Sequence, residues 1–463
     1  MTTTKCLALV AAAITMATVS PLAQGAGPLG LATGASVSAL AVRVSDGKTL
    51  AQYDSNRRLT PASLTKSFTT AMAMRKLGPE ARLTTTFGLR GADLVVHGSF
   101  DPTIGSRYFG SGSLAQVADS VAGRLIAKGV RQIENLEIDL SLAPLQRYGG
   151  CRLWEDIGNG YGAIPSGVMD SDNELSLFFS TPAATGAECR LDSIVPDIMS
   201  GLRPRVCVTS YAGRADKTNV FIADSALWLA IGQLPQGRKA FCVKAAAPSP
   251  EMTFARRLAS LLAARGVSVA NVRLTEKPEP DTTLFVHSSP TIAEIAKQTN
   301  THSLNHYADA LALHMSTDGL RSRASWDAAG EQLTNFWRNA ARVKPFFRDG
   351  SGLAPYNAVS AADVVAMLKS MRNSNVWPDY KASLPRLGKE GTWAGLGADT
   401  PICGKVWAKS GSMTGVVSYG GLMTMPNGDE VLFCVIVNHF EESPYGVKKR
   451  IVDWLLHIYK TKS

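Results

Sequence analysis

The chain changes its secondary-structure pattern twice, and these changes constrain its fold more than any other feature of the sequence. A hairpin and a helix near the N-terminus give way at about Leu83 to short β-like runs, and helical patterns return from Thr291. Two long strands, Val416–Met425 and Glu430–Asn438, precede a terminal amphipathic helix. This order predicts one α/β domain made from both ends of the chain, with a mostly β domain inserted in it. The predicted short strands are 83–89, 93–98, 133–140, 175–179 and 219–222.

The domain division follows from this order and from the length of the chain. A chain of 463 residues is long enough for two or three domains with substantial cores. Its hydrophobic and charged fractions, 45% and 19%, are typical of a globular protein and exclude a disordered chain. We predict a signal peptide at 1–25, a discontinuous domain of 26–82 and 281–463, and an insert at 83–280 with a nested subdomain near 180–248.

The first residues have the pattern of a secretion signal. Lys5 is the charged start, Cys6–Val19 is the apolar stretch, and Ala23–Ala26 is a small-residue cleavage region. The apolar stretch is too short to span a bilayer comfortably, which favours cleavage over a retained N-terminal anchor. The sequence therefore predicts an exported protein with no transmembrane anchor after cleavage.

Six of the seven cysteines lie beyond this leader, an even number that permits disulfides in an exported chain. Their spacing leaves the connectivity open; Cys189 and Cys207, which flank one short segment, are the first candidates for a pair. Cys434 lies in a strongly apolar run and is also compatible with a buried core thiol. No Cys-x-x-Cys spacing is present and the seven histidines form no ligand pattern, so we expect neither a metal nor a cofactor.

The formal net charge of +10 suits an anionic polymer or peptide, or a basic surface with no dedicated partner. No nucleic-acid-binding motif accompanies it, so nucleic acid is not expected as a partner.

Ser63 and Lys66 lie three residues apart where the first helix is predicted to begin. Thr60 is the expected N-cap and Pro61 the first helical residue, which places Ser63 in the first turn. Residues at this spacing share a helix face, and a lysine with a lowered pKa can take the proton of a serine hydroxyl. The same spacing at Ser45–Lys48 falls in the turn of the hairpin 37–44/49–53 and is predicted to be structural.

Two further motifs carry polar groups that suit the same site. Lys409-Ser410-Gly411, followed by Ser412, lies where a strand begins and can hold a carboxylate. The second of these motifs, a serine two residues before an asparagine, has two candidates in the sequence. Ser171-Asp172-Asn173 lies in the insert, whereas Ser303-Leu304-Asn305 starts a helical run in the domain that carries Ser63. Because reacting groups must share one cleft, we choose Ser303 and Asn305 and interpret Ser171 as a turn residue.

In this order, Ser63-x-x-Lys66, Ser303-x-Asn305 and Lys409-Ser410-Gly411 resemble the three motifs of penicillin-recognising serine enzymes. With its large insert, the chain resembles the D-alanyl-D-alanine carboxypeptidase/endopeptidase family of class C low-molecular-mass penicillin-binding proteins. Segments 96–103, 161–163 and 348–353 agree with that family. Two positions depart from it: Ser410 replaces the usual threonine but keeps the hydroxyl, and Ser99-Phe100 replaces glycines before Asp101.

The resemblance implies a penicillin-binding/β-lactamase-like transpeptidase fold, an antiparallel sheet flanked by helices, with a mostly β inserted domain. It also implies a periplasmic serine DD-peptidase that forms an acyl-enzyme on Ser63. Such an enzyme would cleave the terminal D-Ala-D-Ala bond and D-Ala–diamino acid cross-links of peptidoglycan stem peptides, and β-lactams would acylate it.

The roles that the resemblance assigns are specific to each residue. Ser63 is the nucleophile and Lys66 the general base, kept neutral partly by the charge of Lys409. Backbone N–H groups of Ser63 and Ser412 hold the oxyanion. Ser303 passes a proton to the departing amine, Asn305 holds the substrate amide, and Lys409 and Ser410 bind the terminal carboxylate. Asp156 is a candidate stem-peptide contact, although its segment could equally pack the insert.

Two other functions compete with this one. A serine β-lactamase or esterase could share the motifs, but the insert is large and no segment offers a separate deacylation glutamate. A catalytically silent cell-wall binding protein is the third hypothesis, and the intact set of motifs argues against it.

Overall fold

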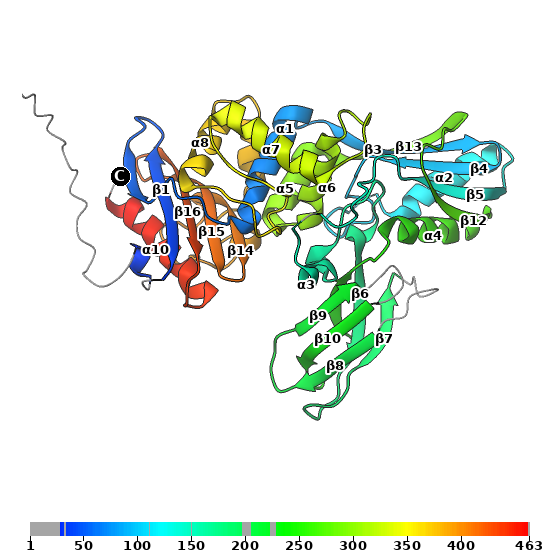
Figure 1. The fold of residues 1–463 in the computed structure, drawn as a ribbon, viewed down its shortest axis with the longest axis horizontal. Coiled ribbons are helices and arrows are strands. Elements are labelled where there is room, and N and C mark those ends of the chain that lie inside the picture. The colour runs from blue at the N-terminus through cyan, green and yellow to red at the C-terminus, as the bar shows by residue number, and fades with distance from the viewer. Residues whose placement is uncertain are drawn as a thin grey trace, which may run out of the picture.

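The computed structural model places the two ends of the chain in one unit and the middle of the chain in two others. Figure 1 shows a sheet at one end of the molecule, helices at its centre, a second sheet at the other end, and a small β lobe that projects to one side. The predicted signal peptide lies outside the described residues. The structure describes residues 28–31, 34–110, 112–149, 151–196, 205–222 and 228–461.

The first sheet is antiparallel and joins both ends of the chain. β1 pairs along its length with β16, so that Ser36 lies opposite Asn438, and the strand order is β14-β15-β16-β1-β2. The hairpin β1–β2 turns through Ser45–Lys48, as predicted. The strands are β1 (Ser36–Arg43), β2 (Thr49–Tyr53), β14 (Val406–Met413), β15 (Val416–Thr424) and β16 (Glu430–Asn438).

Both faces of this sheet are covered, which explains the unbroken apolar run in β16. Leu432, Cys434 and Ile436 pack against the central helices, whereas the alternate residues Val431 and Phe433 pack against α10 (Pro444–Thr461). Cys434 is therefore a core thiol. The central helices are α1 (Thr65–Leu77), α5 (Ile292–His302), α6 (Asn305–Ser316), α7 (Trp326–Ala341), α8 (Ala361–Arg372) and α9 (Trp377–Ser383).

The second sheet is mixed, with strand order β12-β5-β4-β3-β13, and helices α2 (Leu114–Ala127) and α4 (Pro250–Ala263) pack on it around Val121 and Leu258. Neither helix is in the sequence prediction, although the capping box at Ser113 and Gln116 signals the first. The sheet also continues beyond residue 280. Its strands are β3 (Arg82–Arg90), β4 (Asp93–Gly98), β5 (Gln132–Asp139), β12 (Ser268–Thr275) and β13 (Thr282–Thr291).

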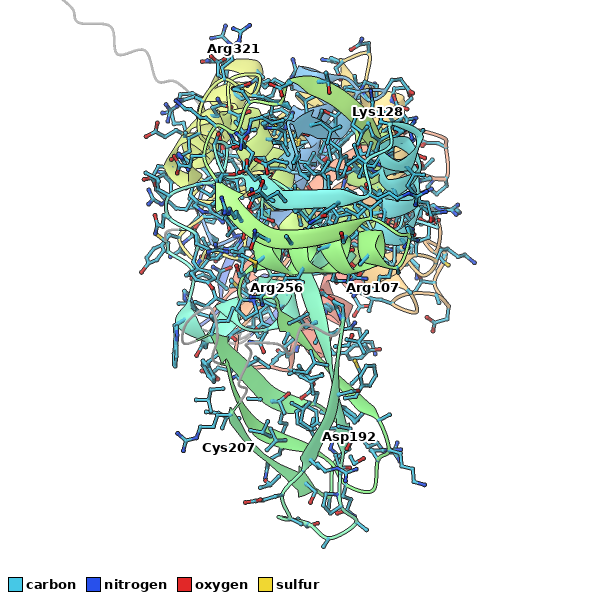
Figure 2. The ribbon with its side chains drawn as sticks, turned by 90° about the vertical axis from the view of Figure 1, so that its right-hand side faces the viewer. Arg107, Lys128, Asp192, Cys207, Arg256 and Arg321 are labelled. Carbon is cyan, nitrogen blue, oxygen red and sulfur yellow. The ribbon has the colours of Figure 1, made fainter. Side chains whose placement is uncertain are left out.

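The projecting lobe consists of two three-stranded sheets, β11-β6-β7 and β8-β10-β9, which share one apolar core (Figures 1 and 2). A bridge between Asn159 and Ala245 joins it to the segment that carries α3 (Trp154–Ile157). The lobe strands are β6 (Glu174–Ser180), β7 (Arg190–Val195), β8 (Arg205–Tyr211), β9 (Lys217–Ile222), β10 (Trp228–Pro235) and β11 (Phe241–Ala246).

The predicted Cys189–Cys207 disulfide is wrong, because all six cysteines beyond the leader are free thiols. The backbone N–H of Cys189 donates to the carbonyl of Val208 at 2.8 Å. Val208, the partner of Cys189, is buried. Successive side chains of a strand point to opposite faces, so its neighbour Cys207 is exposed while Cys189 is buried.

Candidate active site

Ser63 lies in a 3₁₀ turn, η2 (Ala62–Leu64), which continues directly into α1. The predicted N-cap at Thr60 is wrong, since its hydroxyl donates to the carbonyl of Pro355 at 3.1 Å and no side chain caps the turn. Ala62 has a φ of +48°, in the left-handed region that non-glycine residues rarely adopt. The spacing to Lys66 nevertheless brings the two side chains together.

Lys66 is fully buried and its ammonium nitrogen reaches three oxygens. Nζ lies 2.8 Å from Ser63 Oγ, 2.5 Å from Asn305 Oδ1 and 2.7 Å from the carbonyl of Ser351. Asn305 Oδ1 and the Ser351 carbonyl oxygen only accept, so they fix the amine while Ser63 can give its proton to it.

Ser303 and Asn305 lie at a break between two helices. The helical run predicted from Ser303 is α6, which begins at Asn305; α5 ends at His302, and Ser303 between them adopts a left-handed conformation (φ 59°, ψ 42°). Through this break Ser303 Oγ accepts a hydrogen bond from Lys409 Nζ at 2.9 Å, while Asn305 contacts Lys66. Asn305 Nδ2 also donates to the carbonyl of Tyr161 at 2.8 Å.

Lys409, Ser410 and Gly411 lie on β14 beside the Ser63 turn. Lys409 is fully buried, and its Nζ also donates to the carbonyl of Ser410 at 2.7 Å. The Ser410 and Thr392 hydroxyls are 2.7 Å apart. Ser412, further along the strand, is exposed.

Gly411 has no room for a side chain. A Cβ at this position would lie 2.3 Å from both the Pro61 carbonyl and Ser418 Oγ, and 2.9 Å from the backbone nitrogen of Leu64. The strand and the Ser63 turn are therefore held in register by direct backbone proximity.

Gly411→Ala is therefore expected to separate β14 from the Ser63 turn and to lower the melting temperature. The acylation rate should also fall, by about 100-fold, because a displacement of reacting groups by about 1 Å can slow a reaction that much. Gly123→Ala is the matched control: Gly123 lies inside α2 with no atom within 4 Å of a new Cβ, and alanine should stabilise that helix slightly. Differential scanning fluorimetry and acylation kinetics measure both. Unchanged acylation in folded Gly411→Ala would contradict this account.

A buried charge cluster lies behind Lys66. Arg152 and Asp309 form an ion pair, with side chains 1% and 0% exposed, and Asp309 Oδ1 accepts from the backbone N–H of Gly350 at 3.0 Å. Asp349 in turn accepts a hydrogen bond from Ser351 Oγ at 3.0 Å. The backbone carbonyl of Ser351 accepts from Lys66. The cluster holds the Gly350–Ser351 backbone against the lysine.

Burial lowers the pKa of Lys66 to about 7, with Asp309 and Asp349 acting to raise it and Arg152 to lower it. Arg152 is thus one cation that assists, besides the effect of Lys409 that the resemblance implies. Burial also lowers the pKa of Lys409, with the charge of Lys66 as a second cause.

If Ser63 and Lys66 act as the resemblance implies, acylation of Ser63 is expected to rise with pH through a midpoint near 7, because only neutral Lys66 can accept the serine proton. Stopped-flow acylation by a chromogenic β-lactam between pH 5 and 9 would measure it. A rate that is flat across this range would exclude Lys66 as the titrating base.

Asp156 is linked through Tyr161 to Asn305, which contacts Lys66. It is half-buried and accepts from the Tyr161 hydroxyl at 2.9 Å, while the carbonyl of Tyr161 binds Asn305. Burial raises the pKa of Asp156, and the bond from Tyr161 opposes this.

Ser171, the alternative to Ser303 in the sequence, makes other contacts. Ser171 lies in the short turn η4 (Ser171–Asn173) and its hydroxyl bonds to Arg257 at 3.0 Å and Asp170 at 3.1 Å. Among the described residues, neither lysine of the cluster is a hydrogen-bond partner of this motif. Asp172 of this motif instead lies against α6, 3.6 Å from His306 Nε2 and 3.4 Å from the Tyr307 hydroxyl.

The sequence analysis missed Arg152, Asp309 and Thr392. Arg152 and Asp309 are distant in sequence and their pairing leaves no local pattern.

The described residues contain no group of three or more His, Cys, Asp or Glu side chains that could hold a metal ion. No helix in the described part of the chain has both the length and the apolar character needed to cross a membrane.

Comparisons with known proteins give the family and the fold of this chain. A D-alanyl-D-alanine carboxypeptidase of Actinomadura sp. (strain R39) is 27% identical over 447 residues, which cover 90% of this chain and 80% of that protein. The crystal structure of penicillin binding protein 4 (dacB) from Haemophilus influenzae superposes with a TM-score of 0.80 at 20% identity, covering 93% of this chain and 98% of that one. The same protein complexed with a β-lactam gives a TM-score of 0.76. Residues 30–458 match the D-Ala-D-Ala carboxypeptidase 3 (S13) family, and the chain belongs to that family of serine hydrolases.

Proposed function

We propose that this protein is a serine DD-peptidase of peptidoglycan that works through an acyl-enzyme on Ser63. The single observation that carries the proposal is the contact of Ser63 Oγ with Lys66 Nζ at 2.8 Å, in a cluster that Asn305, Ser303 and Lys409 complete. A buried amine with a pKa near 7 beside a hydroxyl is a base suited to activate a nucleophile.

In the first step, Ser63 Oγ attacks the carbonyl of the penultimate D-alanine while its proton passes to Lys66. The backbone N–H groups of Ser63 and Ser412 would hold the oxyanion. The C–N bond then breaks, Ser303 relays a proton to the departing amine, and an ester remains on Ser63. Water hydrolyses this ester, with its proton again taken by the base, and the free serine is restored.

Lys409 and Ser410 would bind the terminal carboxylate of the substrate, and Asn305 its amide. Lys409 is buried beside a second lysine, so a carboxylate entering the site would favour its charged form. Asp156 is proposed as a contact of the stem peptide, because its partner Tyr161 adjoins Asn305.

The same site would cleave D-Ala–diamino acid cross-links, since those differ from the terminal bond only in the departing amine. β-Lactams would acylate Ser63, and the leader together with this substrate favours a periplasmic location. We also propose the division into a discontinuous catalytic domain and an insert with a nested lobe, with the end of the insert after β13 and not at residue 280, because β13 pairs with β3.

Mass spectrometry after incubation with benzylpenicillin tests the acylation. One adduct should appear on the peptide that contains Ser63 and should be absent from Ser63→Ala; no adduct on folded protein would overturn the proposal. Incubation with a pentapeptide and with cross-linked muropeptides separates the two activities. Release of D-alanine with cross-links intact would remove the endopeptidase part.

A further inference from the structure

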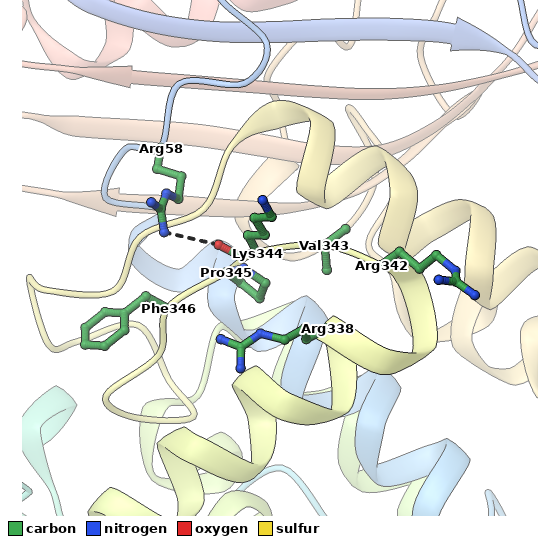
Figure 3. A pocket seen from close by; sticks show the side chains of 7 residues that line it. All are labelled: Arg58, Arg338, Arg342, Val343, Lys344, Pro345 and Phe346. Atoms are coloured by element: carbon green, nitrogen blue, oxygen red, sulfur yellow. Dashed lines mark hydrogen bonds between the residues drawn. The ribbon is translucent and has the colours of Figure 1, made fainter.

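A cavity of about 460 Å³ lies outside the Ser63 cluster and is lined largely by basic side chains (Figure 3). Arg58 comes from the loop before the Ser63 turn, Arg338 and Arg342 from the end of α7, and Lys344 from the segment after it. All four are exposed. Val343, Pro345 and the 44% exposed ring of Phe346 complete the wall.

Within the described residues, these four cations have no carboxylate partner. Arg58 Nη1 donates to the carbonyl of Lys344 at 3.3 Å and Arg338 Nη1 to Asn335 Oδ1 at 2.9 Å, both neutral acceptors (Figure 3 draws the first). Asp363 lies behind them but is occupied, since its carboxylate accepts from Ser360 and from the backbone N–H of Lys344.

The cations at the end of α7 have a partial explanation in the helix itself. A helix C-terminus attracts positive charge, which accounts for Arg338 and Arg342. It does not account for Arg58, which reaches the cavity from another part of the chain. Arg342 also holds a left-handed conformation (φ 54°, ψ 36°), where glycine is the usual residue.

Figure 3 shows the guanidinium of Arg342 pointing away from those of Arg58 and Arg338, so the latter two are the cations closest to a common ligand; like charges repel, and an anion between them would reduce that repulsion. Guanidinium groups match phosphate oxygens in a two-pronged geometry, and three of the four cations here are arginines. The open cavity would admit a chain of phosphates as well as a single group.

We propose that this cavity, which we call the Arg58 pocket, binds a ligand with two or more linked phosphate groups. The source is either a small soluble phosphate compound or a phosphate-bearing polymer. The net charge of +10 assists the approach of either one, whereas the pocket provides the site.

Isothermal titration calorimetry of the full chain with inorganic pyrophosphate and with long-chain polyphosphate tests the proposal. In Arg58→Gln/Arg338→Gln the affinity should fall about tenfold or more, because charge-assisted hydrogen bonds are lost. The matched control is Lys128→Gln/Arg321→Gln, which removes the same charge from exposed positions on other elements (Figure 2). Its effect should be small because distant surface charges are screened.

Pyrophosphate binding that depends on the Arg58 pocket would support a small ligand as the source, and binding of polyphosphate alone with the same dependence would support a polymer. An equal loss in both double variants would show general charge attraction and overturn the proposal. Absence of binding to either probe would do the same. Turnover at Ser63 in all variants checks folding.

Discussion

Lys66→Met is expected to slow the acylation of Ser63 by about 1,000-fold, within the range that general-base catalysis contributes. The side chain keeps its length and its burial but loses the group that accepts the serine proton. Ser63 Oγ would lose its contact at 2.8 Å and would have to ionise without a base. Acylation by benzylpenicillin, followed by mass spectrometry over time, measures the rate.

Lys66→Arg is the control for charge. Arginine keeps a cation near Asn305 and the Ser351 carbonyl, but its guanidinium does not deprotonate in proteins. We therefore expect it to be as slow as Lys66→Met. If Lys66→Arg keeps near-normal acylation, the lysine acts through its charge and the assignment as base is wrong.

Much of the fold could be predicted because its signals are local. The hairpin β1–β2, the strands β15 and β16 and the helix α10 all have clear periodicity or turn residues in the sequence. The five-stranded sheet around β3 was predicted only in part. Its helices α2 and α4 occur in a region of many short strands, where a single period does not stand out.

For the site, the choice of Ser303 over Ser171 depended on topology, and the geometry supports it through the contact with Lys409. The left-handed conformation of Ser303 was not predicted, because non-glycine residues rarely adopt it and the sequence has no local signal for it.

The cause of the low pKa of Lys66 could not be predicted, because it depends on burial and on residues far apart in sequence. Arg152 lies before α3 and Asp309 on α6, and only the folded chain brings them behind the lysine. Their ion pair also joins the segment between the second sheet and the lobe to the central helices.

Arg152→Met is expected to lower the free energy of unfolding by about 3–5 kcal/mol, because the fully buried Asp309 loses its ion-pair partner. Removing this cation should also raise the pKa of Lys66, since Arg152 acts to lower it, and the midpoint of the acylation profile should move to higher pH. Urea denaturation and the pH profile measure the two effects independently.

Two variants make this test specific. Arg152→Met/Asp309→Leu removes both charges and should recover most of the lost stability, as buried pairs replaced by apolar side chains often do. Arg386→Gln breaks an exposed pair with Glu390, whose charged atoms are 2.8 Å apart, and should cost less than about 1 kcal/mol. An Arg152→Met effect no larger than that of Arg386→Gln would mean that Asp309 is neutral in the fold. The pH midpoint would still move to higher pH, because the charge of Arg152 acts on Lys66 directly.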